Sequence, residues 1–307
     1  MQYLKKIPLR QKLSGKPIKS HYNKGTMALN TKAIKKYLWI GLLLLPSLLF
    51  MVYPECILIK SSLIDSETGQ FTLKFFSRIL IPRFWGRVEN TIIISILATS
   101  ISLLVGIPLS FYLWKRDFWG KKALTSMLLI PYMTPNYILV LAVIFIFGKN
   151  GIINFTLRAL LNIPDFTLPF SILFTYHGLV LVFAFHNLAL VVFICMAVLS
   201  SIEPEYEEAA ISLGATPLKA ILRVILPLAL PGIGGSGILI FARTMSNYVV
   251  VFLVGGTKYA TLAVEVVDQY FGFFVTDFPA ALAVFLSLMT MFVMYTYLFF
   301  YQRRFAL

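Results

Sequence analysis

The chain has 307 residues, of which 59% are hydrophobic and 13% are charged, and its mean hydropathy is +0.83. Polar side chains in this number cannot cover the surface of a water-soluble globule of this size. The composition therefore excludes a soluble domain and indicates a membrane protein. The formal net charge is +14, but the basic residues mostly flank apolar segments and are not interleaved with aromatic residues on a polar face. This pattern favours membrane lipid as the charge partner and argues against a nucleic acid.

The first 36 residues form a basic tail with ten Lys and Arg residues and no Asp or Glu. A segment of such charge and low hydrophobicity cannot bury enough apolar surface to fold alone, so 1–36 is expected to be a solvated, partly disordered leader. A regulatory or partner-binding role is the alternative. The polar stretch is much too long for the n-region of a cleavable signal peptide.

Six apolar runs follow, each near the length of about 20 residues that a helix needs to cross the hydrocarbon core. They lie at 38–59, 90–113, 123–147, 178–199, 231–253 and 280–301. Prolines fall in or beside several of these runs, and a bundle tolerates them because neighbouring helices can satisfy the freed carbonyls. The predicted fold is an all-α membrane protein with six transmembrane helices.

The distribution of Lys and Arg predicts the orientation, since cytoplasmic loops keep the positive excess. The tail, the loop at 114–122, the segment at 200–230 and the C-terminus together hold 18 of these residues, against 8 in the three opposite loops. The remaining one, Arg243, lies inside a predicted span. Both termini are therefore expected in the cytoplasm, as an even number of spans requires.

The sequence lacks the motifs of common catalytic and metal sites. It has no G-x-x-x-x-G-K-[ST] phosphate loop, no G-x-S-x-G elbow and no H-E-x-x-H helix. Cys56 and Cys195 have no partner at metal-ligand spacing and are expected to be packing residues. His177 and His186 have no acidic residue near them in the sequence and are expected to be structural. We therefore expect no enzymatic activity, no metal site and no cofactor bound by this chain.

The polar segment at 200–230 interrupts the apolar pattern between the fourth and fifth spans. Pro204 and the acidic residues after it predict a helix start, because the positive end of the helix dipole favours acids. Gly214 predicts the end of that helix. Thr216-Pro217 predicts a second helix over about 217–226, which Pro227 and Pro231 are expected to break. Two short helices at an angle, with small Ala209 and Ala210 allowing close approach, indicate a docking element.

At these residues the chain resembles the integral-membrane permease subunits of binding-protein-dependent ATP-binding-cassette importers. Their cytoplasmic loop carries E-A-A, three residues, G, nine residues and I-x-L-P. Here the motif stands as Glu208-Ala209-Ala210, Gly214 and Val224-Ile225-Leu226-Pro227, with only Val224 departing from it. Two spans follow the motif, so the resemblance covers about 85–301. The other expected segments are the tail 1–36, a first helix and outer loop at 37–84, and a C-terminus at 302–307.

The resemblance implies a type I importer permease fold and a set of partners. These are two ATPase subunits that bind ATP and Mg, a second permease subunit that is expected to be a different chain, and an extracytoplasmic substrate-binding protein. It also implies the plasma membrane of a prokaryote, the inner membrane in a Gram-negative cell. The loop would dock in a cleft of the ATPase, and the expected coupling residues are Glu207, Glu208, Ala209, Ala210, Gly214, Leu226 and Pro227.

The sequence says less about the transported molecule than about the family. The sequence from Tyr206 to Ala215 resembles the branch of the family that transports polyamines, ferric iron, phosphonates and related oxyanions. Spermidine or putrescine is the first expectation for the substrate. The candidate pathway residues are Glu55, Arg243, Asn247 and Tyr248. An arginine in the path suits an anion, whereas Glu55, Glu265 and Asp268 would suit a cation, and the sequence does not rank them. The segments 154–161 and 270–274 are candidates for meeting the binding protein.

Two other classes compete with the permease. An ion-driven secondary carrier would be expected to show internal repeats with broken-helix sites, and no such repeat is apparent. An integral-membrane enzyme would need polar catalytic clusters in its loops, which are lacking. Co-purification separates the classes, because a permease should bring a soluble ATPase with it.

Overall fold

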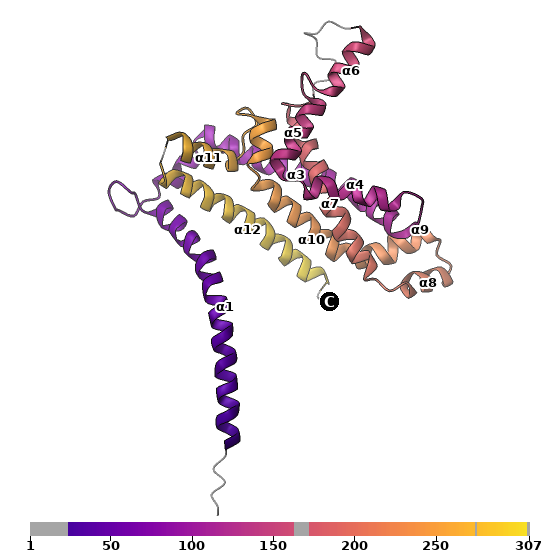
Figure 1. Ribbon diagram of the computed structural model, residues 1–307, viewed down its shortest axis with the longest axis horizontal. Helices are drawn as coiled ribbons and strands as arrows, with labels where there is room; N and C mark the ends of the chain where they lie inside the picture. The colour runs from indigo at the N-terminus through magenta and orange to yellow at the C-terminus, as the bar shows by residue number, and fades with distance from the viewer. Residues whose placement is uncertain (1–23, 163–171, 274, 306–307) are drawn as a thin grey trace, which may run out of the picture. The chain divides into compact units, whose positions relative to one another are not determined.

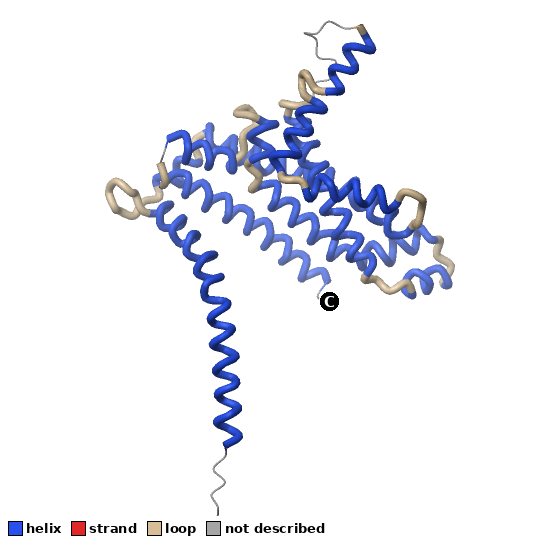
Figure 2. The backbone as a smooth tube through the Cα atoms, in the orientation of Figure 1, coloured by secondary structure: helices blue, strands red, loops and turns tan. Residues whose placement is uncertain are grey.

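The computed structural model describes residues 24–162, 172–273 and 275–305. The chain divides into two compact units, Met1–Cys56 and Ile57–Leu307, and each is considered by itself. In the described ranges almost every ordered segment is helical (Figure 2), and the strand-like pairing found there is an isolated antiparallel bridge between Ile64 and Phe71. The predicted all-α fold is confirmed.

The helices follow the apolar runs of the sequence and alternate with short polar elements (Figure 1). In chain order they are α1 (Lys24–Leu63), α2 (Lys74–Ile79), α3 (Pro82–Lys115), α4 (Lys121–Met133), α5 (Asn136–Phe147), α6 (Ile152–Leu161), α7 (Tyr176–Ser200), α8 (Glu205–Ser212), α9 (Pro217–Ala220), the π-helical turn η1 (Ile221–Ile225), α10 (Leu226–Met245), the π-helical turn η2 (Val251–Gly255), α11 (Leu262–Phe273) and α12 (Asp277–Phe305).

Six segments of the described chain are long and apolar enough to cross a membrane, the number that the sequence predicts. They are Lys35–Leu63, Pro82–Lys115, Asn136–Leu161, Tyr176–Ser200, Pro217–Met245 and Asp277–Phe299. The third differs from the prediction, because the run at 123–147 is divided between α4 and α5. The apolar segment counted there joins α5 to α6 instead.

Helices α3, α7 and α10 form the centre of the second unit. At Gly106 of α3 an added Cβ would lie 2.6 Å from Cγ1 of Val191 in α7, so only glycine allows this close approach. A core that includes Val191, Cys195 and Ile240 fills the space between α7 and α10. Cys195 is thus a packing residue as expected, whereas Cys56 in α1 is exposed.

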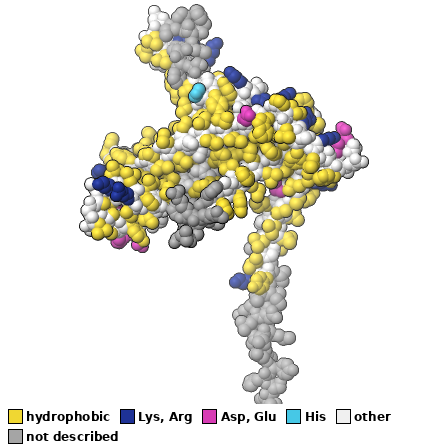
Figure 3. Space-filling model, turned by 180° about the vertical axis from the view of Figure 1, so that it is seen from behind, with side chains coloured by type: hydrophobic (Ala, Val, Ile, Leu, Met, Phe, Trp, Pro, Cys, Tyr) yellow, Lys and Arg dark blue, Asp and Glu magenta, His cyan; other side chains and the backbone are white. Residues whose placement is uncertain are grey.

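Apolar side chains also cover the outside of the bundle. Hydrophobic residues dominate the face seen in Figure 3, and large ones such as Leu104, Leu228 and Phe292 are exposed on α3, α10 and α12. A soluble protein does not leave an apolar surface of this extent in water. The surface therefore fits the hydrocarbon of a membrane.

The helical path is broken at the edges of two apolar segments. Helix α4 ends at Met133 and α5 begins at Asn136, with Thr134 and Pro135 between them. Pro135 restricts the residue before it to extended conformations, and Thr134 has φ −75° and ψ 130°. Helix α10 ends at Met245, and the chain is non-helical at 247–248 before it continues toward η2.

The predicted break at Pro227 and Pro231 is wrong. The helix that begins at Pro217 continues through η1 into α10, with Pro227 in the first turn of α10 and Pro231 inside it. In η1 the N–H of Leu226 bonds to the carbonyl of Ile221, five residues earlier, which widens the turn. This widening gives the ring of Pro227 room that a regular α-helix denies it.

Candidate coupling element and pathway site

Helix α8 is a short polar helix at one end of the bundle, next to the ends of α3 and α7 (Figure 1). Glu205, Glu207 and Glu208 occupy its first turn, where the helix dipole favours acids. The chain then turns at Gly214, whose φ of +89° is a left-handed conformation that other residues rarely adopt. Thr216 caps the next helix by accepting from the N–H of Lys219 at 3.4 Å. The predicted pair of helices with a glycine turn is present.

Glu207 ties α8 to α3. Both of its carboxylate oxygens accept from Nζ of Lys115, the last residue of α3, at 2.6 Å. Glu207 is 7% exposed, while the side chain of Lys115 keeps 43% of its surface. The sequence grouped Glu207 with the residues that meet the ATPase, but the structure turns this carboxylate inward toward α3. Lys115 was not recognised from the sequence, because the 92 residues between the partners leave no local pattern.

The opposite face of α8 is exposed. Tyr206, Glu208, Ala209 and Ile211 are all accessible, and Ala210 is half-buried. Leu213, beside the glycine turn, keeps 90% of its surface. An apolar residue this accessible beside small alanines leaves room for another surface to approach closely. The structure thus brings the exposed motif residues together on one side of the element and Glu207 on the other.

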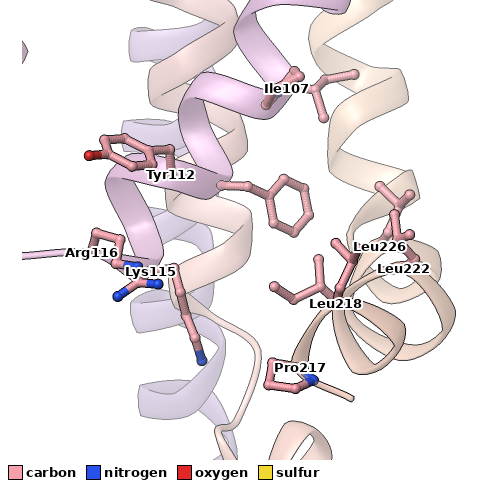
Figure 4. A pocket seen from close by; sticks show the side chains of 11 residues that line it. Ile107, Tyr112, Lys115, Arg116, Pro217, Leu218, Leu222 and Leu226 are labelled. Atoms are coloured by element: carbon pink, nitrogen blue, oxygen red, sulfur yellow. The ribbon is translucent and has the colours of Figure 1, made fainter. Parts of the chain in front are cut away.

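A groove of about 790 Å³ separates α3 from the segment that follows the glycine turn. In Figure 4 Leu218 points into the groove toward α3, with Ile107 toward one end and Lys115 and Pro217 toward the other. Leu222 also lines the groove. Leu226 lines the groove and also packs against the core between α7 and α10. Pro227, the last motif residue, is exposed. Leu226 and Pro227 are therefore the first residues of α10, apart from the exposed face of α8.

Arg243 lies within α10 and contacts two other helices. Its Nη2 lies 2.7 Å from Nε2 of His186 in α7, and its guanidinium lies 5.7 Å from the ring centroid of Tyr132 in α4. One residue further, Thr244 accepts from the amide of Asn187 at 2.9 Å. The sequence proposed Arg243 as a pathway residue, but it did not connect it with His186 or Tyr132.

Asn247 and Tyr248 occupy the interruption after α10. Asn247 is buried, and its side-chain oxygen accepts from the N–H of Val250 at 3.0 Å, which restarts the helix. Tyr248 is half-buried and stacks on Phe252 with ring centroids 5.2 Å apart. The remaining candidate, Glu55, is an exposed residue of α1 at the end of the first unit.

Acidic residues gather at α11, at the end of the bundle away from α8. Glu265 is 3% exposed and accepts from Nε of Arg87 in α3 at 3.3 Å and from the amide of Gln269 at 2.8 Å. Asp268 is exposed, and its pKa is raised first by desolvation and then by the charge of Glu265. Glu265 is thus a structural tie between α3 and α11, and Asp268 is the more accessible acid.

The family of binding-protein-dependent transport system inner membrane components matches residues 102–306. This chain belongs to that family. The matched range contains α8, the glycine turn and Arg243.

Curated relatives of two kinds are similar to the chain. The putative 2-aminoethylphosphonate transport system permease protein PhnU of Salmonella typhi is 30% identical over 238 residues, which cover 77% of this chain and 81% of the relative. The spermidine/putrescine transport system permease protein PotB of Escherichia coli strain K12 is 24% identical over 245 residues, which cover 78% and 87%.

A solved structure confirms the fold. A chain of a bacterial ABC transporter involved in the import of the acidic polysaccharide alginate superposes with a TM-score of 0.75 at 16% identity, covering 89% of this chain and 98% of that one. The fold is that of a type I ABC importer permease.

Proposed function

We propose that this chain is the permease subunit of an importer driven by a separate ATPase, and that the ATPase binds helix α8. The supporting observation is the division of α8 into two faces. Glu208, Ala209 and Ile211 are accessible to a partner, while Glu207 is fixed to Lys115 on the other side. Such an element can receive a displacement on one face and pass it to the bundle through the other.

Two routes lead from α8 into the spans. The first is the Glu207–Lys115 ion pair, which joins α8 to α3. The second is the uninterrupted helix from α9 through η1 into α10, whose far end carries Arg243. Binding of ATP can shift the permease between two conformations only if the contacts of the chain differ between them. A rigid connection from α8 to the spans would carry a movement of the ATPase to those contacts.

The proposal includes the partners and the orientation that the sequence predicts. Two ATPase subunits hold the ATP and Mg, a second permease completes the pathway, and a binding protein delivers the cargo on the far side. The α8 end and both chain termini face the cytoplasm. This chain itself hydrolyses nothing.

Two cargo classes are candidates. A polyamine is the expectation from the sequence, and the similarity to PotB supports it. A small phosphonate is the second, supported by the similarity to PhnU and by Arg243, a cation inside the bundle. In both classes the delivered molecule is small and charged.

Co-purification and reconstitution test the proposal. The tagged chain, extracted in mild detergent from cells that hold the whole transporter, should bring an ATPase with it, and Gly214→Asp should lose uptake while its membrane abundance stays normal. An added Cβ at Gly214 has nothing within 4 Å, so a new side chain meets no neighbour in this chain, but the φ of +89° strains any other residue. Gly214→Asn, which tolerates this conformation, is therefore the control for backbone strain. Normal uptake by that variant would count against α8 as the coupling element.

A further inference from the structure

Arg243 is a charged residue inside a span without a carboxylate partner among the described residues. The ion pairs found there are Asp65–Lys74, Arg87–Glu265, Lys115–Glu207 and Asp117–Lys121, and none involves Arg243. An uncompensated arginine within a membrane is costly and faces protein or water. Arg243 is half-buried, so its guanidinium is not sealed off.

The contact with His186 leaves donors without acceptors. Arginine carries only N–H donors, so Nε2 of His186 must accept at the 2.7 Å contact. The proton of the neutral ring then sits on Nδ1, which is buried and has no partner in the described part of the chain. His186 is 1% exposed. The pair therefore presents a buried N–H and the guanidinium N–H groups that His186 does not use, and these are donors only.

The pair lies in the middle of the bundle. His186 is ten residues from the start of α7, or about 15 Å at 1.5 Å per residue. Val250 and Val251, beyond the interruption of α10, pack in the same core as Val182 and Phe183, one turn of α7 nearer its start. The interruption at 247–248, just after the apolar segment that ends at Met245, therefore lies beside the same part of α7 as the pair.

A second interruption adjoins the same arginine. Tyr132 is the penultimate residue of α4, which ends just before Thr134 and Pro135. Its ring centroid lies 5.7 Å from the guanidinium of Arg243, and 40% of the residue is exposed. An aromatic face holds a guanidinium in place without neutralising its charge. Two helix breaks, at 134–135 and 247–248, thus lie near one oriented cation, and discontinuous helices are the elements at which transporters bind ions or substrates.

We propose that Arg243, His186 and Tyr132 form a subsite for the anionic group of the cargo, a phosphonate or phosphate oxygen cluster. The planar guanidinium can hold two such oxygens at once. The inference deepens the proposed function and rests on it, since it names the cargo class of the same pathway. A polyamine carries no group that this subsite accepts.

A transport experiment with two cargoes tests the subsite. The whole transporter, with its ATPase and binding protein, is reconstituted in liposomes that contain ATP, and uptake of labelled 2-aminoethylphosphonate and of labelled putrescine is measured. Arg243→Gln should lower phosphonate uptake by roughly 10- to 100-fold, the scale of hydrogen bonds to a charged group, and Arg243→Lys should lower it less. Arg83→Gln, which removes an exposed arginine at the start of α3, is the matched control and should change nothing.

A binding measurement keeps the test independent of transport. Proton NMR saturation transfer from the purified complex of permease and ATPase, without the binding protein, to the methyl group of methylphosphonate should be present in the wild type and lost in Arg243→Gln and His186→Ala. Equal transfer in wild type and Arg243→Gln, or none in the wild type, overturns the subsite. Import of putrescine alone, unaffected by Arg243→Gln, also overturns it but leaves the proposed function intact. Failure to co-purify an ATPase would instead defeat the proposed function.

Discussion

The ion pair between Lys115 and Glu207 gives the sharpest mutational prediction. Lys115→Met keeps the length of the side chain and removes its charge, which leaves the 7%-exposed carboxylate of Glu207 without its partner. The substitution changes no other residue of α3 or α8. We expect the variant to insert and fold, but to transmit the motion of α8 poorly to α3.

The magnitude follows from the exposure of the two partners. Removing one member of a fully buried pair costs about 3–5 kcal/mol, and an exposed pair contributes about 0–1 kcal/mol. Glu207 is buried, but Lys115 keeps 43% of its side-chain surface, so solvent screens the pair and a cost of about 2 kcal/mol is reasonable. Since about 1.4 kcal/mol changes an equilibrium tenfold, α8 should detach from α3 roughly 30-fold more often.

The assay is the number of cargo molecules imported per ATP hydrolysed by the reconstituted transporter. Lys115→Met should lower this ratio while ATP hydrolysis continues, and the exchange Lys115→Glu with Glu207→Lys should recover part of it. The matched control is Lys121→Met, because Lys121 pairs at 2.7 Å with Asp117, whose side chain is 97% exposed. An unchanged ratio in Lys115→Met, at normal abundance, would refute this account of the ion pair.

Three further predictions concern other parts of the chain. Gly214→Ala should cost about 1 kcal/mol of backbone strain at φ +89°, and Gly214→Asn should show less strain in a thermal melt, because Asn tolerates this conformation; equal melting temperatures would argue against the strained turn. Arg87→Met should lower the melting temperature by leaving buried Glu265 unpaired, whereas Arg83→Met should not. Lys74 lowers the pKa of Asp65 by hydrogen bonding. The turn at 64–74 should therefore be protected from hydrogen exchange above pH 3.8 and should lose this protection as the pH falls through the lowered pKa. Protection that rises on acidification would contradict this.

The spans and the two short helices α8 and α9 were predictable because their signals are local. Apolar runs of sufficient length identify spans, and Pro204, Gly214 and Thr216-Pro217 mark the ends of the two short helices. The break before α5 also has a local cause in Pro135. The sequence failed at Pro227, because the π-helical turn that accommodates this proline has no simple sequence signal.

The contacts between distant segments were not predictable. Lys115 was assigned only to the positive excess of its loop, and His186 only to a structural role, since nothing in either neighbourhood points to Glu207 or Arg243. The interruption after Met245 has neither Gly nor Pro; Asn247 makes it possible by capping the next helical segment. Such features depend on which helices pack together, and a single sequence does not specify this at the level of side chains.

A photo-crosslink from α8 tests the central claim most directly. Tyr206 is 50% exposed on α8, and Phe271 is 66% exposed on α11 at the other end of the bundle. Replacing each in turn with benzoylphenylalanine, in membranes that hold the whole transporter, places a probe at either end. The account predicts an adduct with the ATPase from position 206 and none from position 271. An adduct of position 206 with the extracytoplasmic binding protein, or the absence of any ATPase adduct there, would contradict it.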